Sequence, residues 1–306
     1  MLLGLCYGQR VVETAPQTKI RLPNGFSFED IFTGTGNKVF VSGATKGKNQ
    51  IIELNTQTKD KKTLKRFNRK FKTLFYLRVK NWFIGGEDGS HIVVMDPTKQ
   101  FKILKRCRIP TGTTATRMTA LNGFLYFGGE GRRLLFRIRV NALLKCQFEN
   151  PVELKFIPQK PEEAFVVDVQ AFKSYLVVGS VKPAKGSLVS SSLHLYNPAN
   201  GNSRILLKNS GDLKWLKSIA ANGNTLFAAT KQGVSNPTKA RQQRITVFRL
   251  IGKGFGEIKL KLLGRYQSNS AGSDFNGIAW NSKKICVNSR RSSKESVVCF
   301  KDVFSV

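Results

Sequence analysis

Residues 121–140, LNGFLYFGGEGRRLLFRIRV, contain most of the unit from which the rest of the chain can be interpreted. An Asn-Gly turn leads into the apolar run 125–127, two glycines and a short loop follow, and residues 134–140 alternate apolar and basic side chains. An Asn-Gly pair beside apolar residues is typical of a tight hairpin, and alternation with a period of two is typical of a strand. The stretch therefore predicts a hairpin turn, a second strand, a loop and a third strand.

The same pattern of an apolar run followed by small residues occurs six times in the chain. The copies begin at Val39, Trp82, Leu125, Leu176, Leu226 and Ile285, and the apolar residues Phe32, Phe75, Met118, Val169, Ile219 and Ile278 lie seven positions earlier. A third β-rich run follows each copy, and a more basic fourth run, such as 101–105 or 203–207, often closes the unit. Six such units predict an all-β fold, a six-bladed β-propeller of four-stranded antiparallel blades.

The two ends of the chain are expected to meet in the last blade. The sixth unit ends soon after its third strand, whereas residues 18–22 form an unassigned strand before the first unit. We expect this N-terminal strand to complete the last blade and close the ring, which protects otherwise open edges. We interpret residues 9–306 as a single propeller domain. Residues 1–8 read as a truncated signal-peptide remnant, with a frayed N-terminus as the alternative.

Loss of that leader would remove Cys6 and leave an even number of cysteines. A hairpin centred between Ser292 and Ser293 places Cys286 opposite Cys299, and we expect these two to form a cross-strand disulfide. Cys107 and Cys146 would then pair between the outer parts of blades two and three. The alternative is four buried free thiols. Two disulfides and a leader favour a secreted, extracellular protein.

The repeated pattern of apolar run, Gly-Gly or Gly-Ser, loop and apolar run resembles that of extracellular propellers, including the sema and Yellow-type classes. The resemblance covers roughly residues 26–306, while the Gly-His and Trp-Asp signatures of WD40 blades are absent. It implies the architecture alone, and no functional residue is transferred from it.

The composition points to an anionic partner. The chain has 51 Lys and Arg against 19 Asp and Glu, a formal net charge of +32. Such an excess favours binding of heparin-like glycans, anionic phospholipid or nucleic acid, with solubility or lineage composition as the alternative. We further interpret the protein as a salivary or venom-type modulator of haemostasis or inflammation.

The densest basic run is 59–72, with eight cations and one anion, and a second run follows at 102–108. We predict that these two runs form one polyanion-binding surface at the outer part of blades one and two. Its members are Lys61, Lys62, Lys65, Arg66, Arg69, Lys70, Lys72, Lys102, Lys105, Arg106 and Arg108. The alternative is that the lysines only protect the edges of outer strands.

Few residues suggest catalysis. His91 and His194 are the only histidines in the sequence, and no zinc-protease, phosphate-loop or nucleophile-elbow motif occurs. We therefore predict a non-enzymatic protein with no cofactor and no metal site. No apolar run is long enough for a transmembrane helix, and we expect a monomer.

Two other functions stay open. A small-ligand scavenger, for a biogenic amine or lipid mediator, would use residues beside the first-strand positions at the channel mouth: Asp30, Arg117, Asp168, Lys217 and Asn276. Pairing of Asp168 with Arg117 or Lys217 would instead be structural. A protein-interaction module would use the long loops 181–192 and 231–244 on one face.

The arginines of the opening stretch raise a separate question. Strict alternation places Leu135, Arg137 and Arg139 on one face of their strand. Inner strands of a propeller pack on both faces, so we predict that an inter-blade carboxylate, Glu130, Glu149 or Glu153, pairs with these arginines. The alternative is that Arg137 and Arg139 emerge on a basic surface.

Overall fold

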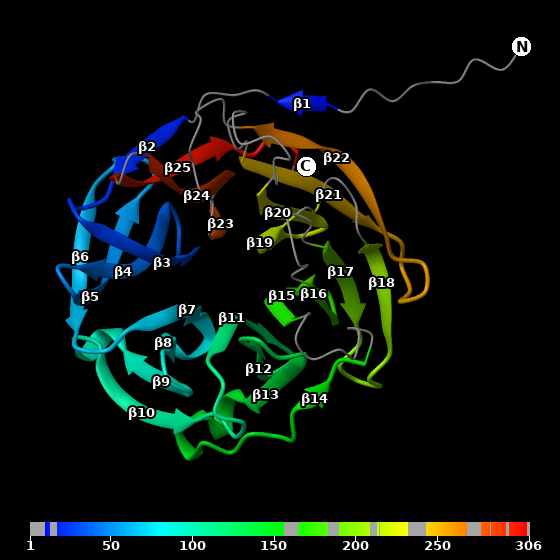
Figure 1. The fold of residues 1–306 in the computed structure, drawn as a ribbon, viewed down its shortest axis with the longest axis horizontal. Helices are drawn as coiled ribbons and strands as arrows, with labels where there is room; N and C mark the ends of the chain where they lie inside the picture. The colour runs from blue at the N-terminus through cyan, green and yellow to red at the C-terminus, as the bar shows by residue number, and fades with distance from the viewer. Residues whose placement is uncertain are drawn as a thin grey trace, which may run out of the picture.

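The computed structural model describes residues 10–12, 17–155, 165–182, 190–208, 213, 215–231, 243–267, 277–281, 283–291 and 294–304. Their strands form six sheets arranged in a ring around a central axis (Figure 1). The prediction of an all-β, six-bladed propeller is confirmed. Residues 1–8, interpreted above as a leader remnant, lie outside the described residues.

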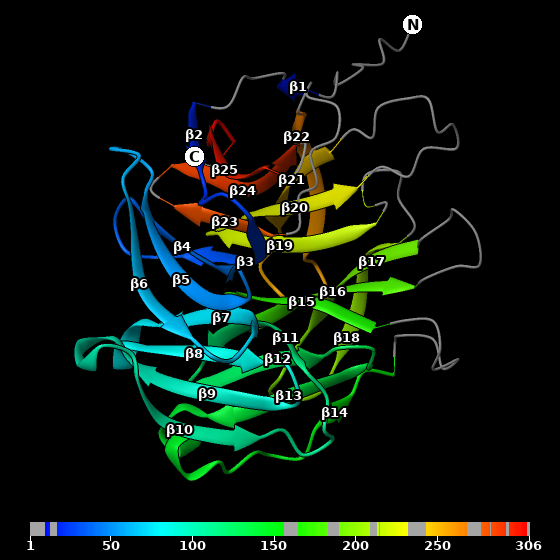
Figure 2. The same cartoon turned by 60° about the vertical axis from the view of Figure 1, so that its left-hand side comes forward.

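Each blade is a meander with one strand at the axis and one at the rim (Figures 1 and 2). From the axis outward, blade one consists of β3 (Phe26–Thr33), β4 (Lys38–Thr45), β5 (Lys48–Asn55) and β6 (Lys61–Phe67). Blade two consists of β7 (Phe71–Leu77), β8 (Trp82–Glu87), β9 (His91–Asp96) and β10 (Lys102–Arg108). Blade three consists of β11 (Ala115–Leu121), β12 (Phe124–Gly129), β13 (Leu134–Arg139) and β14 (Val152–Glu153).

The remaining blades repeat this order. Blade four consists of β15 (Phe165–Phe172), β16 (Tyr175–Lys182), β17 (Ser190–Tyr196) and β18 (Ser203–Lys208). Blade five consists of β19 (Leu216–Asn222), β20 (Thr225–Lys231), β21 (Gln243–Ile251) and β22 (Lys259–Gln267). Blade six consists of β23 (Ile278–Asn281), β24 (Lys284–Arg291), β25 (Lys294–Lys301) and β2 (Thr18–Arg21). The described helices are three short 3₁₀ turns, η1 (Arg78–Lys80), η2 (Pro97–Lys99) and η3 (Val140–Lys145).

The N-terminal strand closes the ring as expected. β2 pairs antiparallel with β25, so that Ile20 lies opposite Val297 and Lys19 opposite Val298. Ile20 is buried in the apolar cluster between blades six and one. A further strand, β1 (Arg10–Val12), pairs in parallel with β22 and gives blade five a fifth strand, which the sequence did not predict.

One apolar cluster fills each of the six interfaces between neighbouring blades. Successive residues of an inner strand contribute to different clusters: Phe83 packs between blades one and two, and Ile84 between blades two and three. Because both faces of the strand are buried, it needs a continuous apolar run rather than alternation. This explains the runs that mark each copy of the repeat.

The small residues after each run allow neighbouring blades to approach near the axis. A Cβ atom added to Gly128 would lie 2.5 Å from the Val166 side chain of the next blade, and one on Gly179 would lie 2.7 Å from the Leu216 side chain of the next blade. Within blade one, a Cβ atom on Gly43 would lie 2.3 Å from the Ser27 carbonyl oxygen. Backbone or branched side chains at these distances cannot move away at little cost. Packing therefore requires these glycines in blades one, three and four, whereas blades five and six have Ala229-Thr230 and Asn288-Ser289 at the equivalent positions.

The alignment of blade one needs a correction. In blade three, the third residue of the apolar run is Phe127, and Met118 lies opposite it. In blade one, the third residue of the run is Val41, and the residue opposite it is Ile31, not Phe32. The hairpin between β3 and β4 is one residue longer, so Phe32 is not the structural equivalent of Met118. As a result, Asp30 of blade one and Asp168 of blade four are structurally equivalent. Each directly precedes the residue that pairs with the third residue of the apolar run, which is Ile31 in blade one and Val169 in blade four.

Both expected disulfides are present. Cys286 and Cys299 lie directly opposite each other on β24 and β25 and are bonded. Cys107 of β10 is bonded to Cys146, which follows η3, with a Cα–Cα distance of 5.2 Å. The first bond links two strands of the closing blade, and the second links the rim of blade two to blade three.

Ring closure predicts different effects for two neighbouring residues of β2. Ile20→Ala should lower the free energy of unfolding by about 2–5 kcal/mol, because it removes buried methyl groups from the closing interface. Lys19→Ala, on the exposed face of the same strand, should change it by less than about 0.5 kcal/mol. Urea unfolding of the two variants measures both values, and equal effects would show that β2 contributes little to closure.

Candidate functional site

The centre of the ring is crossed by one arginine. Arg117 of β11 lies 3.5 Å from an Asp30 carboxylate oxygen through Nη2 and 3.5 Å from Asp168 through Nε. It also donates hydrogen bonds to the Ser218 hydroxyl and to the Ile31 carbonyl oxygen. Arg117 thus connects blade three with blades one, four and five across the axis.

The two aspartates are held in the same way by the blade that follows each. Asp30 Oδ2 accepts hydrogen bonds from Thr73 Oγ1 at 2.9 Å and from the Leu74 amide at 3.2 Å. Asp168 Oδ2 accepts from Ser218 Oγ at 3.0 Å and from the Ile219 amide at 2.8 Å. Blades one and four lie opposite each other, so the network is close to two-fold symmetric around Arg117 (Figure 1).

Burial controls the charge of this network. Desolvation raises the pKa of both carboxyls, that of Asp168 to about 6, and the Arg117 guanidinium opposes the rise. With both carboxylates ionised, one guanidinium faces two negative charges. The arrangement is suited to holding blades together and leaves neither carboxylate exposed to a ligand.

The structure brings together three of the five residues considered for a small ligand: Asp30, Arg117 and Asp168. Lys217 lies over the Trp215 ring, with its Nζ atom 5.2 Å from the ring centroid. Asn276 lies outside the described residues, as do 183–189 and 232–242, the middle parts of the two long loops.

The outer strands of blades one and two carry eight of the eleven basic residues expected there. Arg69 and Lys70 lie between β6 and β7, and Lys72 lies on β7, the axial strand of blade two, instead of on an outer strand. β6 and β10 contain four basic residues each and no acidic residue. The two runs meet at Glu87, a buried carboxylate that pairs with Arg69 at 3.0 Å and with Arg106 at 2.6 Å. Arg69 follows β6 and Arg106 belongs to β10, so one side chain links the two basic runs.

Two other members of the predicted set also have partners within the protein. Lys70 pairs with Glu29 at 2.7 Å, and a hydrogen bond to this carboxylate raises the lysine pKa. Lys61 donates to the Arg21 carbonyl oxygen at 3.2 Å. The other seven residues have no carboxylate of the described part of the chain within ion-pair distance: Lys62, Lys65, Arg66, Lys72, Lys102, Lys105 and Arg108.

A small basic pocket adjoins this surface. It has a volume of about 310 Å³ and lies between the β4–β5 hairpin, β6 and the loop before β3. Lys46, Lys48 and Arg66 line it together with the polar groups of Gln50 and Thr63, and its lining within the described part of the chain contains no acidic residue. Sequence analysis did not include Lys46 or Lys48, because only the hairpin brings them beside Arg66.

The arginines of β13 have an internal partner. Glu149 pairs with Arg137 at 2.6 Å and with Arg139 at 3.3 Å, and both guanidinium groups lie within 5.5 Å of the Phe124 ring centroid. The prediction that a carboxylate of the protein pairs with these arginines is confirmed. Arg139 stays largely exposed, so the pair lies near the surface of the blade.

A cavity of about 720 Å³, here named the mouth cavity, is a further feature that the sequence did not reveal. It opens at the axis, on the face where the hairpins join the first and second strands of the blades. Every blade contributes to its lining, with Thr33, Phe75, Ala120, Gln170, Ala221 and Trp280 from blades one to six in order. No linear motif marks such a site, because each blade supplies only a few residues.

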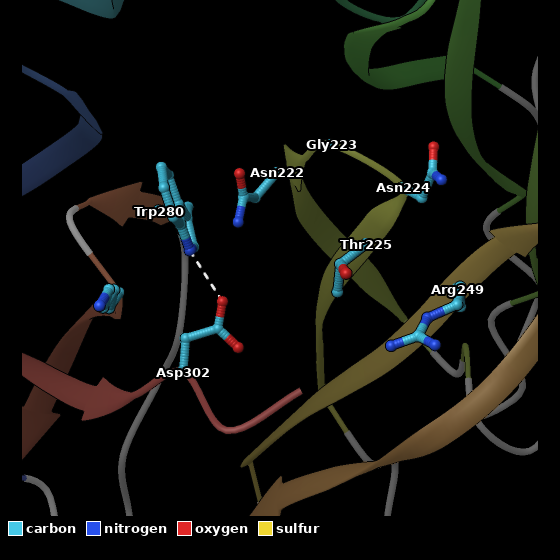
Figure 3. Close-up of a pocket in the computed structure, with 8 residues that line it drawn as sticks. Asn222, Gly223, Asn224, Thr225, Arg249, Trp280 and Asp302 are labelled. Atoms are coloured by element: carbon cyan, nitrogen blue, oxygen red, sulfur yellow. Dashed lines mark hydrogen bonds between the residues drawn. The ribbon is translucent and has the colours of Figure 1, made fainter. Parts of the chain in front are cut away.

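A second cavity of about 730 Å³ adjoins the mouth cavity between blades five and six (Figure 3). The two share Asn222, Gly223 and Trp280. Figure 3 shows the Trp280 indole pointing toward Asp302, to which its Nε1 donates a hydrogen bond of 2.9 Å. Arg249 lies on the opposite side of this cavity.

The two histidines have local partners. His194 is buried next to Ser180, with 3.1 Å between its Nε2 and the Ser180 hydroxyl, and burial lowers its pKa to about 4. His91 begins β9, and its Nδ1 lies 3.3 Å from the Arg106 guanidinium. Among the residues that the structure describes, no three His, Cys, Asp or Glu side chains gather as metal ligands would.

Comparison with known proteins supports the architecture and no closer relationship. No family model matches the chain, and no curated protein matches it. A chain in the crystal structure of the mitotic checkpoint complex is similar, with 10% identity and a TM-score of 0.59 over 96% of this chain and 94% of that one. The structure of U3-55K is similar too, with 11% identity and a TM-score of 0.56 over 94% of this chain and 100% of that one.

At these identities the likeness concerns the fold alone. It gives no support at the family level to the resemblance to sema and Yellow-type propellers. Within the described ranges, no helix has the length and apolar character needed to cross a membrane.

The central network predicts a pH-dependent cost for removing Arg117. The pKa of Asp168 is higher in the folded protein than in the unfolded chain. Protonation of this carboxyl therefore stabilises the fold at low pH, and this contribution is lost as the pH rises from about 4 to about 6. Arg117→Met leaves two buried carboxyls without their cation and raises both pKa values further. The free energy of unfolding of the variant should therefore be about 3–5 kcal/mol lower than that of the wild type near pH 7.5. Near pH 4.5, where the carboxyls can protonate, this difference should be clearly smaller.

Urea unfolding at the two pH values measures this difference. Arg132→Met provides the control, since Arg132 is exposed and does not belong to the ion pairs and hydrogen bonds that Arg117, Asp30 and Asp168 form. An equal deficit for Arg117→Met at both pH values would mean that its guanidinium acts by packing and not by charge.

Proposed function

We propose that the protein is a secreted, non-enzymatic propeller that binds polyanions through the outer part of blades one and two. The observation that carries this proposal is the concentration of eight basic and no acidic residues on β6 and β10. Internal carboxylates engage only some of the cations nearby, and the basic pocket with Lys46, Lys48 and Arg66 adds a concave site for one sulfate or phosphate group.

Binding would proceed by charge neutralisation. A sulfated glycan or phosphate polymer would release its condensed counterions as it meets the row of lysines, which gives affinity with a steep dependence on salt and little dependence on sequence. The pairs at Glu87 and Glu29 fix the backbone of this surface, because they tie the segment between β6 and β7 to blades one and two. Extracellular action is supported by the two disulfides.

In an extracellular setting, the expected partners are heparin-like glycans and anionic phospholipid surfaces, and nucleic acid released from cells is a third. Occupation of such surfaces would interfere with haemostasis or inflammation, as a salivary or venom-type protein does. Edge protection is the competing explanation for basic outer strands. It predicts no difference between β6 and other basic outer strands, such as β22, in binding a polyanion.

The test is retention on a heparin column in a salt gradient. Wild-type protein should elute well above about 0.2 M salt, and Lys62→Glu/Lys105→Glu should elute distinctly earlier, with the slope of log K against log salt reduced by about 2. Elution of the wild type at or below about 0.2 M would contradict the proposal.

The matched control reverses two exposed lysines on other outer strands, Lys19 of β2 and Lys259 of β22. Lys19→Glu/Lys259→Glu has the same net charge as the test variant, so a purely nonspecific attraction would shift both equally. An equal shift would assign retention to the total charge of the protein and not to β6 and β10.

A further inference from the structure

We propose that the mouth cavity binds an amphipathic organic anion, a molecule with one apolar body and one acidic group. Its volume of about 720 Å³ lies within the range of small-molecule sites in proteins. The proposal is independent of polyanion binding, because the mouth cavity lies at the axis and the basic surface lies at the rim.

The walls of the cavity suit an apolar body. Phe75, Leu121, Val140 and Trp280 line it from blades two, three and six, and Gln170 is the lining residue from blade four. Aromatic and aliphatic walls with a few amide groups are typical of sites that bury most of a small ligand. The ring of hairpin turns at this face supplies those amides, including Asn122 and Asn222.

The rim of the cavity suits an acidic group. η1 places Arg78, Val79 and Lys80 at the opening, and all three are exposed. Val79, with 78% of its surface exposed, is the most exposed large apolar residue of the described chain. An apolar side chain between two cations, at the entrance to an apolar cavity, matches a ligand whose acid group stays near the water and whose body inserts.

The sign of the ligand charge follows from the lining. Among the residues that the structure describes, none that lines the mouth cavity is acidic. The adjoining cavity adds Arg249 and Lys283, and its one acidic residue, Asp302, accepts the Trp280 indole hydrogen bond. A cationic ligand would meet Arg78 and Lys80 without a compensating carboxylate.

The aspartates of the central network do not change this sign. Asp168 is fully buried, and Gln170 separates it from the cavity by donating to its Oδ1 at 3.4 Å. Asp30 is engaged by Thr73, Leu74 and Arg117. Among the described residues, an amine would therefore meet no free acidic group at this mouth, which argues against the biogenic amine, but not against the lipid mediator, of the small-ligand alternative.

Calorimetric titration with dodecanoate and with dodecylamine tests the proposal, because the two probes share one chain length and differ in charge. Dodecanoate should bind one site with a Kd of about 10–100 μM, and dodecylamine should bind at least about tenfold more weakly. Equal affinity for the two probes, or no binding of dodecanoate, would overturn the proposal.

Two variants locate the site. Arg78→Glu/Lys80→Glu should weaken dodecanoate binding by about tenfold, whereas Lys99→Glu/Lys253→Glu, an equal charge change at exposed lysines outside the lining, should leave it unchanged. Ala120→Phe should fill part of the cavity and abolish binding. Its unfolding curve shows whether the fold is intact, and retained affinity in the rim variant would overturn the assignment.

Retention on heparin separates this proposal from the previous one. The Arg78→Glu/Lys80→Glu variant should elute together with its charge-matched control. Dodecanoate binding without heparin retention would support the mouth cavity and contradict the polyanion surface, and the reverse result would do the opposite.

Discussion

The pairing of β2 with β25 is the constraint on which the rest of the structure depends. Every blade of the ring buries both faces against its neighbours, so the unfolding of one blade exposes two apolar interfaces, as the clusters on the two sides of blade six illustrate. The last blade takes its outer strand from the beginning of the chain, which joins residues almost 280 positions apart, such as Ile20 and Val297. The Cys286–Cys299 disulfide strengthens the same blade by linking its two central strands.

Closure also determines what happens at the axis. Six inner strands converge there, and glycines such as Gly128 permit an approach that a Cβ atom would prevent. The space that is left is crossed by Arg117, which satisfies buried carboxylates of two opposite blades. A buried charge must be paired or pay a large desolvation cost, so this part of the channel holds the ring together. The space for a ligand lies beyond it, at the hairpin face.

The distribution of charge separates structural from available cations. Glu87, Glu29 and Glu149 each take one or two basic side chains near a blade interface or the edge of a sheet. With 19 acidic residues for 51 basic ones, the carboxylates leave most of the positive charge unbalanced. Eight of the basic residues lie on the outer strands β6 and β10, which carry no acidic residue.

The number of blades, the order of their strands, the closing strand and both disulfides could be predicted from the sequence. These features follow from local periodicity, turn residues and register, which repeat in each unit. The sequence also placed four basic residues on each of the outer strands β6 and β10, although the end of the first run, with Lys72, lies on β7. It anticipated that a carboxylate of the protein would pair with Arg137 and Arg139.

Only the tertiary structure decided the remaining features. The longer hairpin of blade one, which makes Asp30 equivalent to Asp168, and the parallel pairing of β1 with β22 have no periodic signal. The sharing of Glu87 by Arg69 and Arg106, and a mouth cavity that takes residues from six blades, depend on contacts between segments far apart in the chain. Local pattern fixes each blade, but the charge and shape of the space between blades arise only when the ring closes.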